Sequence, residues 1–211
     1  MKKKLILVGG GEHCESCIDV IEQENIFCIA GIVDLPEKLN ESVLGYKIIG
    51  TDVDLPLLVK EYNNFLVTIG HVKDPLPRIR LYNKLKELKV NLPSIISPSA
   101  YVSKYAYLGR GSIVMHHSIV DVNSKIGNNC IINHSSTIGH YANVKDHCHI
   151  SANCVLGRCK INKGTFIGGN SWITNGISIA SFCVIGSGSN VLKSFEEKNS
   201  IIVGNPARKI K

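Results

Sequence analysis

The fold of the second half of this chain is decided by residues 101–156, which read YVSKYAYLGRGSIVMHHSIVDVNSKIGNNCIINHSSTIGHYANVKDHCHISANCVL. Every sixth residue of this stretch is aliphatic, in a series that runs through Val102, Leu108, Val114, Val120, Ile126, Ile132, Ile138, Val144, Ile150 and Leu156. After Leu156 the frame slips by one residue, and the period is continued by Ile161, Ile167, Ile173, Ile179, Ile185 and Val191. A fixed period over this length is the signature of a repeat architecture.

A second periodic position holds small residues. Four places after the aliphatics stand Ala106, Ser112, Ser118, Ser124, Cys130, Ser136, Ala142, Cys148, Cys154, Thr165, Ser171, Cys183 and Ser189, and only Ile177 breaks the series. Glycine often follows the aliphatic directly, where a tight corner tolerates it best. This pattern predicts a short strand and a turn in each repeat, with three repeats closing one triangular coil. Cys130, Cys148, Cys154 and Cys183 are then expected to pack as small buried residues.

The first half alternates strand-like and helix-like segments. Strands are expected at Lys4–Val8, Phe27–Val33 and Phe65–Ile69, and helices at Cys14–Glu24, Leu55–Tyr62 and Arg78–Leu88. The alternation predicts a small parallel sheet in a Rossmann-like α/β subdomain. We therefore expect two domains, residues 1–97 and residues 98–211, the second ending in a short C-terminal tail.

Gly9–Gly11 form a glycine-rich turn between the first expected strand and the first expected helix. Such a turn directs backbone N–H groups and a helix dipole at an anion, and Asp34 after the next strand can accept a hydrogen bond from a sugar or base. A purely structural turn is the alternative, because Cys14 replaces the third glycine of G-x-G-x-x-G. Cys14 and Cys17 also match C-x-x-C, and the helix N-terminus is expected to lower the pKa of the Cys14 thiol, which leaves a redox role as a further alternative.

Composition narrows the function classes. The chain has 211 residues, of which 44% are hydrophobic, enough for a core and too many for a disordered protein. The 24 Lys and Arg against 17 Asp and Glu give a net charge of +7, which favours phosphorylated ligands, but basic and aromatic residues do not interleave as nucleic-acid binding requires. No apolar run suits a membrane span, and the first eight residues are too short for a signal peptide. Eight irregularly spaced cysteines favour reduced thiols, so we expect a cytoplasmic protein.

Motifs from both halves together resemble one family. They are Gly9-Gly10-Gly11-Glu12-His13, Asp34, Gly70, Asn133, Gly139-His140, His149-Ile150 and the terminal Gly204-Asn205-Pro206-Ala207-Arg208. With the six-residue repeat, they resemble the hexapeptide-repeat acetyltransferases, in particular the nucleotide-sugar N-acetyltransferases and the related sialic acid O-acetyltransferases. The resemblance implies a left-handed parallel β-helix, acetyl-CoA as co-substrate with no metal, a nucleotide-linked amino sugar as acceptor, and a homotrimer whose active sites lie between neighbouring subunits.

The resemblance also implies roles for individual residues. It makes His140 the general base, and the repeat independently places this side chain on the outer face, after inward Ile138 and the turn at Gly139; a plain surface histidine is the alternative. Substrate binding is implied for Gly11, His13, Asp34, Gly70 and Asn133. Cofactor binding is implied for His149, Gly157, Gly168, Gly169 and Ser187, with Arg208 and Lys209 near the phosphates. A structural role is the alternative for the glycines and Asn133, and an incidental surface position is the alternative for His149.

Several positions depart from the family's pattern. Close relatives usually carry an acid directly after the catalytic histidine, but this chain has Tyr141, so the group that orients His140 is not visible in the sequence. Ala152-Asn153 replaces a common P-G segment, the frame slip at Arg158–Lys160 shortens a loop that usually carries two glycines, and Glu12 replaces a glycine near the expected diphosphate.

Three other functions stay open. A zinc enzyme with three histidines between subunits is disfavoured because no two histidines are five residues apart, although His116 and His134 should stack on one face. An O-acetyltransferase acting on sialic acid or another sugar has the same fold. A trimer that binds a sugar nucleotide without catalysis is the third alternative, because one fold hosts many functions. The sequence specifies neither the nucleotide nor the sugar.

Overall fold

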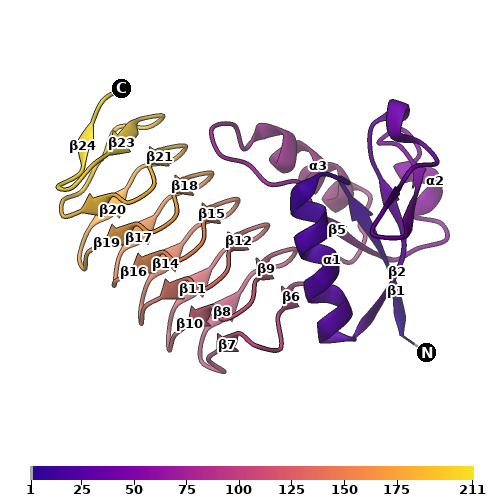
Figure 1. Ribbon diagram of the computed structural model, residues 1–211, viewed down its shortest axis with the longest axis horizontal. Helices are drawn as coiled ribbons and strands as arrows, with labels where there is room; N and C mark the ends of the chain where they lie inside the picture. Colours follow the sequence, from indigo (N-terminus) through magenta and orange to yellow (C-terminus); the bar gives the residue numbers. More distant parts are fainter. Residues whose placement is uncertain (1) are drawn as a thin grey trace.

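The computed structural model describes residues 2–211, and Met1 lies outside the described residues. Figure 1 shows two halves, a small α/β half and a long stack of triangular coils. Helix α1 (Glu12–Glu24) lies between the sheet of the first half and the coils of the second, and the C-terminus is at the far end of the stack.

The α/β half is built on a five-stranded sheet in the order β3-β4-β2-β1-β5. Its elements are β1 (Lys3–Val8), α1, β2 (Phe27–Val33), the 3-10 turn η1 (Pro36–Lys38), β3 (Ser42–Val43), β4 (Tyr46–Gly50), α2 (Leu55–Leu58), β5 (Asn64–Val67) and α3 (Leu76–Glu87). Strand β1 is central and runs parallel to β2 and β5. Its last four residues are fully buried, which explains why they form a continuous apolar run. The predicted Rossmann-like sheet is confirmed.

Two details of this half differ from the expectation. The helix predicted over Leu55–Tyr62 ends at Leu58, because the N–H groups of Lys60 and Glu61 bond to carbonyls only three residues back and tighten the chain into turns. The hairpin of β3 and β4 was not predicted. Strand β3 has only two residues and neither is buried, so no alternation marks it in the sequence.

The coil half consists of three parallel sheets. The covered sheet contains β6 (Ile95–Ile96), β9 (Ile113–Val114), β12 (Ile131–Ile132), β15 (His149–Ile150), β18 (Phe166–Ile167), β21 (Val184–Ile185), β23 (Ile201–Val203) and the antiparallel β24 (Arg208–Lys209). The apolar sheet contains β7 (Tyr101–Val102), β10 (Ile119–Val120), β13 (Thr137–Ile138), β16 (Val155–Leu156), β19 (Trp172–Ile173) and β22 (Asn190–Val191). The polar sheet contains β8 (Tyr107–Leu108), β11 (Lys125–Ile126), β14 (Asn143–Val144), β17 (Lys160–Ile161) and β20 (Ser178–Ile179).

The register of these strands confirms the repeat and its slip. Ile131 pairs with His149, which is 18 residues later, as three repeats of six require. Asn143 instead pairs with Lys160, only 17 residues later, at the place where the sequence loses a residue. The β-helix predicted from the period is therefore confirmed. The first strand of the coil half, β6, pairs with β9 and lies just before residue 98, the expected start of the second domain. The division into two domains stays a prediction.

The small residues of the repeat face inward at the corners and bond to the next coil. Ser112 Oγ donates to the Gly127 carbonyl at 2.8 Å, and Ser136 Oγ donates to the Ser151 carbonyl at 2.6 Å. The four predicted core cysteines are buried, and their thiols make the same kind of contact, as in Cys130 Sγ to the Lys145 carbonyl at 3.2 Å. These positions thus combine small volume with a weak donor.

The corner glycines have a different cause from the one expected. The residues with positive φ stand two places further on and are often asparagine, such as Asn129 (φ 56°) and Asn153 (φ 56°). Gly109 is required because a Cβ at this position would lie 2.5 Å from the backbone carbonyl carbon of Gly127 in the next coil. Close approach of coils, and not conformational freedom, therefore selects glycine directly after the inward aliphatic.

The outer faces of the three sheets differ. Helix α1 packs on the covered sheet, where Cys17, Ile18 and Ile21 share one apolar cluster with Ile113 and Ile131. The outward residues of the apolar sheet are Tyr101, Ile119, Thr137, Val155, Trp172 and Asn190, and those of the polar sheet are Tyr107, Lys125, Asn143, Lys160 and Ser178. Only the covered sheet has its outer face packed against the α/β half.

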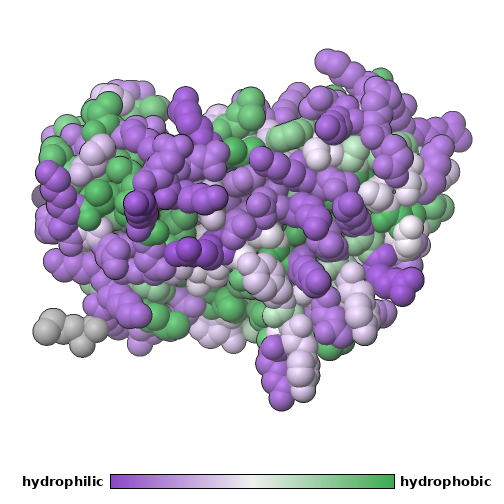
Figure 2. Space-filling view, turned by 180° about the vertical axis from the view of Figure 1, so that it is seen from behind, coloured by the Kyte–Doolittle hydropathy of each residue, from purple (hydrophilic) through white to green (hydrophobic). Residues whose placement is uncertain are grey.

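Figure 2 shows the molecule from behind, with apolar residues gathered most broadly over the α/β half and hydrophilic residues over much of the coil half. Across residues 2–211, none of the helices combines the length and apolar character that a bilayer crossing requires.

Candidate functional site

The turn after β1 is held by Asp34, which follows β2. Gly10 N–H donates to Asp34 Oδ2 at 2.8 Å, and Lys38 Nζ lies 3.3 Å from the same oxygen. Gly9 has a φ of 107°, and a Cβ there would lie 2.1 Å from the Ile69 side chain, so the turn needs glycine for both conformation and space. Asp34 therefore has a structural role here, while its predicted contact with a sugar or base stays a prediction.

Gly11 is the first residue of this turn that is open. It caps the N-terminus of α1, and a Cβ built on it would meet no atom within 4 Å. The backbone N–H groups of a helix N-terminus attract anions, although Glu12 and Glu15 in the first turn of α1 weaken that attraction.

Three histidines meet where the α/β half contacts the coils. The His149 ring, on β15 of the covered sheet, lies 5.5 Å from the His71 ring and 6.2 Å from the His13 ring, between centroids. His149 Nδ1 donates to the His71 carbonyl at 2.7 Å. Gly70 packs against the His13 side chain, because a Cβ built on Gly70 would lie 3.5 Å from His13 Cβ. The interpretation of His149 as an incidental surface residue is wrong, since its side chain is buried.

His71 is a member of this histidine cluster that the sequence analysis missed. It directly follows Gly70 at the end of the segment after β5, and that adjacency was the available signal. Neither ring nitrogen of His71 has a hydrogen-bond partner, and His149 Nε2 and Arg78 Nη2 are also buried without one. Buried polar atoms that the protein leaves unpaired are suited to binding a polar ligand.

Burial keeps the three imidazoles neutral. Desolvation lowers the pKa of His13 and of His71 to about 3, and that of His149 to about 4, with the Arg78 guanidinium adding to each shift. Arg78 itself is buried and donates to the carbonyls of Val67 and Ile69. Neutral imidazoles beside a buried cation can donate or accept hydrogen bonds without adding charge.

His140 lies away from this cluster, on the corner between the apolar and polar sheets. It follows β13, its side chain is 61% exposed, and the Tyr141 ring stands perpendicular to it at 5.9 Å. Asp121 Oδ2 lies 3.9 Å from His140 Nδ1. Asp121 was not predicted, because an acid was expected directly after the histidine. It lies in the preceding coil at the position equivalent to Gly139, so the signal was an acid one coil back beside the residue equivalent to His140.

The remaining predicted residues lie on the two corners that border the apolar sheet. Gly157 is on the His140 corner, and a Cβ there would lie 2.4 Å from Asn175 Oδ1. Asn133, Gly168, Gly169 and Ser187 lie on the opposite corner, between the covered and apolar sheets. Asn133 Oδ1 accepts the His134 N–H at 2.8 Å, and Gly168 allows backbone contact with Ser187. These residues thus have structural reasons for their types, and their ligand contacts stay predictions.

The C-x-x-C expectation is wrong in its physical basis. Cys14 and Cys17 are both fully buried in α1, and burial raises the pKa of the Cys14 thiol to about 11 instead of lowering it. A thiol that stays protonated at neutral pH is a poor nucleophile, so this pair does not have the properties of a redox motif. The His116 and His134 rings stack 5.4 Å apart, and His116 Nε2 lies within hydrogen-bond distance of Asp19 Oδ2, at 2.7 Å. Within residues 2–211, no three His, Cys, Asp or Glu side chains come together as metal ligands.

Comparison with known proteins finds one family model and several similar solved structures. The PglD N-terminal domain family matches residues 4–85. Perosamine N-acetyltransferase from Caulobacter crescentus, solved as a histidine-to-asparagine mutant with CoA and GDP-perosamine, is 26% identical with a TM-score of 0.92, covering 99% of this chain and 97% of that one. The acetyltransferase domain of PglB from Neisseria gonorrhoeae is 25% identical with a TM-score of 0.88, covering 99% and 100%. The chain thus carries a PglD N-terminal domain and is similar over almost its whole length to N-acetyltransferases of the hexapeptide-repeat family.

A further structure agrees with this fold. WeeI from Acinetobacter baumannii superposes on this chain with a TM-score of 0.86 at 18% identity, covering 99% of this chain and 100% of that one. A search of curated proteins with the sequence finds no match.

The buried histidine cluster predicts acid sensitivity. The ordinary pKa of histidine is 6.5, and His71 is lowered to about 3, so the folded protein resists a proton that the unfolded chain accepts. Stability from this group is complete above pH 6.5 and is lost as the pH falls toward 3. Between pH 7 and pH 5, the unfolding free energy of the wild-type protein should therefore fall by about 2 kcal/mol more than that of His71→Asn.

The measurement is urea unfolding at pH 7 and pH 5 at one protein concentration. The control is His117→Asn, at an exposed position outside the cluster. Identical pH dependence in His71→Asn and wild type would contradict the prediction.

Proposed function

We propose that this protein transfers the acetyl group of acetyl-CoA to the amino group of a nucleotide-linked amino sugar, with His140 as general base. The observation that carries the proposal is the match over almost the whole of both chains to an N-acetyltransferase solved with CoA and GDP-perosamine. His140 suits the role because its ring is exposed, and because Asp121 lies on the side of Nδ1, which leaves Nε2 free to accept a proton.

The reaction needs one proton acceptor and no acyl-enzyme. As the amine nitrogen forms its bond to the thioester carbon, His140 Nε2 takes the proton that the nitrogen loses. When the carbon–sulfur bond breaks, the protonated ring can return that proton to the departing thiolate. A backbone N–H of a neighbouring coil would stabilise the charge that develops on the carbonyl oxygen. Acetyl-CoA supplies the activated acyl group.

Asp121 is proposed as the residue that positions His140. Its carboxylate lies 3.9 Å from Nδ1, close enough to favour one orientation of the ring and to stabilise it when protonated. Tyr141 occupies the place where the family's pattern has an acid, and its φ of 58° sets it at the turning point of the corner. In this proposal the acid that orients the histidine comes from the preceding coil instead of from the following residue.

The substrates are proposed to occupy the residues named from the sequence. The nucleotide sugar would bind at Gly11, His13, Asp34, Gly70 and Asn133, and acetyl-CoA at His149, Gly157, Gly168, Gly169 and Ser187. The neutral histidine cluster supports this proposal, because its unpaired nitrogens offer hydrogen bonds near the open end of the Gly9–Gly11 turn. The eight unpaired cysteines are compatible with a reducing compartment such as the cytoplasm.

A homotrimer is proposed because the site is divided within one chain. His140 and Asn133 border the apolar sheet on opposite sides, while His13 and His149 lie on the covered side. The apolar sheet presents Ile119 and Trp172 to solvent, with 41% and 47% exposure. Burying this face against a second copy would bring the His140 corner of one chain near the covered side of another.

The activity test is loss of thioester absorbance from acetyl-CoA with a panel of UDP-, GDP- and dTDP-linked amino sugars. One amino sugar should support turnover, and His140→Ala should reduce it by at least about a hundredfold, the lower end of the range for a lost general base. His117→Ala is the control, because it removes another exposed corner histidine. Silence across the panel would overturn the amino-sugar proposal and favour hydroxyl acceptors.

Loss of the Asp121 carboxylate should slow catalysis without weakening binding. Asp121→Asn is expected to lower kcat about tenfold, with the KM for acetyl-CoA and the melting temperature unchanged, since about 1.4 kcal/mol of transition-state stabilisation is lost. Glu196→Gln, which removes an exposed carboxylate from the far end of the coils, is the matched control. A rise in KM with unchanged kcat would show that Asp121 binds ligand instead.

The trimer can be tested at matched strand positions. Ile119→Lys places a charge on the outer face of the apolar sheet, and Ser178→Lys places the same charge on the outer face of the polar sheet. Sedimentation velocity should show a smaller species only for Ile119→Lys, because a buried unpaired charge opposes association. A trimer that persists in Ile119→Lys would exclude this face as the interface.

A further inference from the structure

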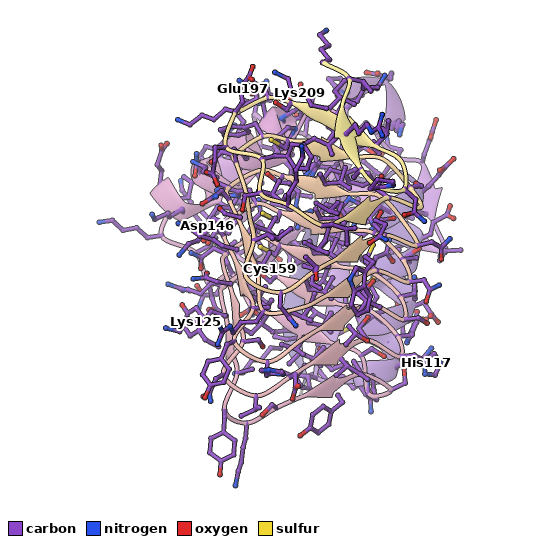
Figure 3. All side chains as sticks on the ribbon, turned by 90° about the vertical axis from the view of Figure 1, so that its left-hand side faces the viewer. His117, Lys125, Asp146, Cys159, Glu197 and Lys209 are labelled. Atoms are coloured by element: carbon purple, nitrogen blue, oxygen red, sulfur yellow. The ribbon has the colours of Figure 1, made fainter. Side chains whose placement is uncertain are left out.

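A second pocket lies on the third edge of the coils, between the polar and covered sheets. It is a cavity of about 550 Å³ bounded by the end of α3, the segment after it, and successive corners of the coil. Figure 3 shows Asp146, which lines this pocket, on the side of the coils opposite His117. His117 is on a corner that borders the apolar sheet, so the pocket faces away from the proposed trimer contact.

The pocket has an aromatic and apolar floor. Tyr82, Val90, Leu92 and His147 line it, and all four are buried. The Tyr82 and His147 rings meet edge to face at 5.4 Å, and His147 Nδ1 lies 2.9 Å from Asn129 Nδ2. Burial lowers the pKa of His147 to about 4, so the ring is neutral at pH 7. A flat ligand group could lie against this floor without meeting a buried charge.

The rim of the pocket is cationic. Lys86, Lys89, Arg110 and Lys163 line it, and all four are exposed. None of them forms an ion pair with another described residue. Asp146 is the acid among the lining residues, and its Oδ1 accepts the Asn128 N–H at 2.8 Å. Four cations and one carboxylate leave a net charge of about +3, which favours an anion at this rim.

The fold explains why these cations meet. Arg110, Asn128, Asp146 and Lys163 occupy equivalent corner positions in four successive coils. Lys86 and Lys89 reach the same place from the end of α3, where cations also stabilise the helix C-terminus. That helix effect accounts for Lys86 in the last turn of α3 but not for Lys89, Arg110 or Lys163. Stabilisation of α3 therefore does not explain why a cavity with an apolar floor is also lined by these cations.

We propose that this pocket binds a nucleoside diphosphate, with the diphosphate on the cationic rim and the base on the Tyr82–His147 floor. Its volume falls within the range of small-molecule sites, which combine an apolar lining with a few convergent polar groups. Its charge matches a diphosphate. None of its lining residues belongs to the proposed acetyl-transfer site, so this is a separate site that stays open in the trimer and can respond to the concentration of free nucleotide.

Calorimetric titration of the full-length protein with UDP, GDP, ADP and pyrophosphate tests the proposal, in the presence of saturating CoA. Lys86→Gln/Arg110→Gln should weaken one class of nucleotide sites at least about tenfold, because two charged contacts to the diphosphate are lost. Lys60→Gln/Lys160→Gln is the matched control, since it removes the same net charge from exposed positions outside the pocket. Pyrophosphate should bind this class more weakly than the best nucleotide, because it does not use the floor.

Two results would overturn the proposal. One is the same isotherms for both double variants, which would show that the rim binds nothing. The other is loss of acetyl transfer in Lys86→Gln/Arg110→Gln while its melting temperature is retained, which would place the pocket in catalysis. The pocket variant should otherwise keep the wild-type initial rate at low nucleotide concentration, so failure of the proposed function and failure of this site give different outcomes.

Discussion

The inward stacking of one aliphatic side chain per repeat is the interaction on which the rest of this structure depends. Each coil places Val, Ile or Leu directly above its counterpart in the coil before, and nearly all of these side chains are fully buried. The stacking sets the separation of the coils, and that separation demands glycine where backbones touch, as at Gly109. It also aligns outward residues into rows, and every candidate ligand-binding feature of the coil half is a row of this kind.

This regularity explains which parts of the molecule the sequence could predict. A period of six reports directly on contacts between coils, so the β-helix and the slip before Lys160 were predicted correctly. The hairpin of β3 and β4 was not, because β3 has only two residues and neither is buried. Within the candidate site, Asp121 and His71 were missed because each meets its partner through tertiary contact, one from a preceding coil and one across the two halves. Local motifs such as C-x-x-C were misleading for a related reason, since burial outweighs the helix dipole at Cys14.

Each face of the triangular coil carries a different kind of surface. The covered sheet holds the α/β half and the neutral histidine cluster, the apolar sheet offers a face for association, and the edge opposite that face carries the cationic pocket. In the proposed trimer, such a division lets association through the apolar sheet complete one site without covering the cationic pocket. The triangular cross-section allows this division, because the outward residues on each face and edge can change while the inward aliphatic residues stay the same.

The buried thiols have a consequence for how the molecule opens. Of the eight cysteines, only Cys28 is exposed, and burial raises the pKa of the thiols that sit inside the coils and α1. Since the thiolate is the reactive form, an alkylating reagent reaches Cys28 in the native state and the other seven only during local or global opening. Cys14 and Cys17 report on α1, whereas Cys130 to Cys183 sample the stack coil by coil. The alkylation rate of each buried cysteine therefore reports how often its part of the chain opens, and the fastest of them marks where the native state first unfolds.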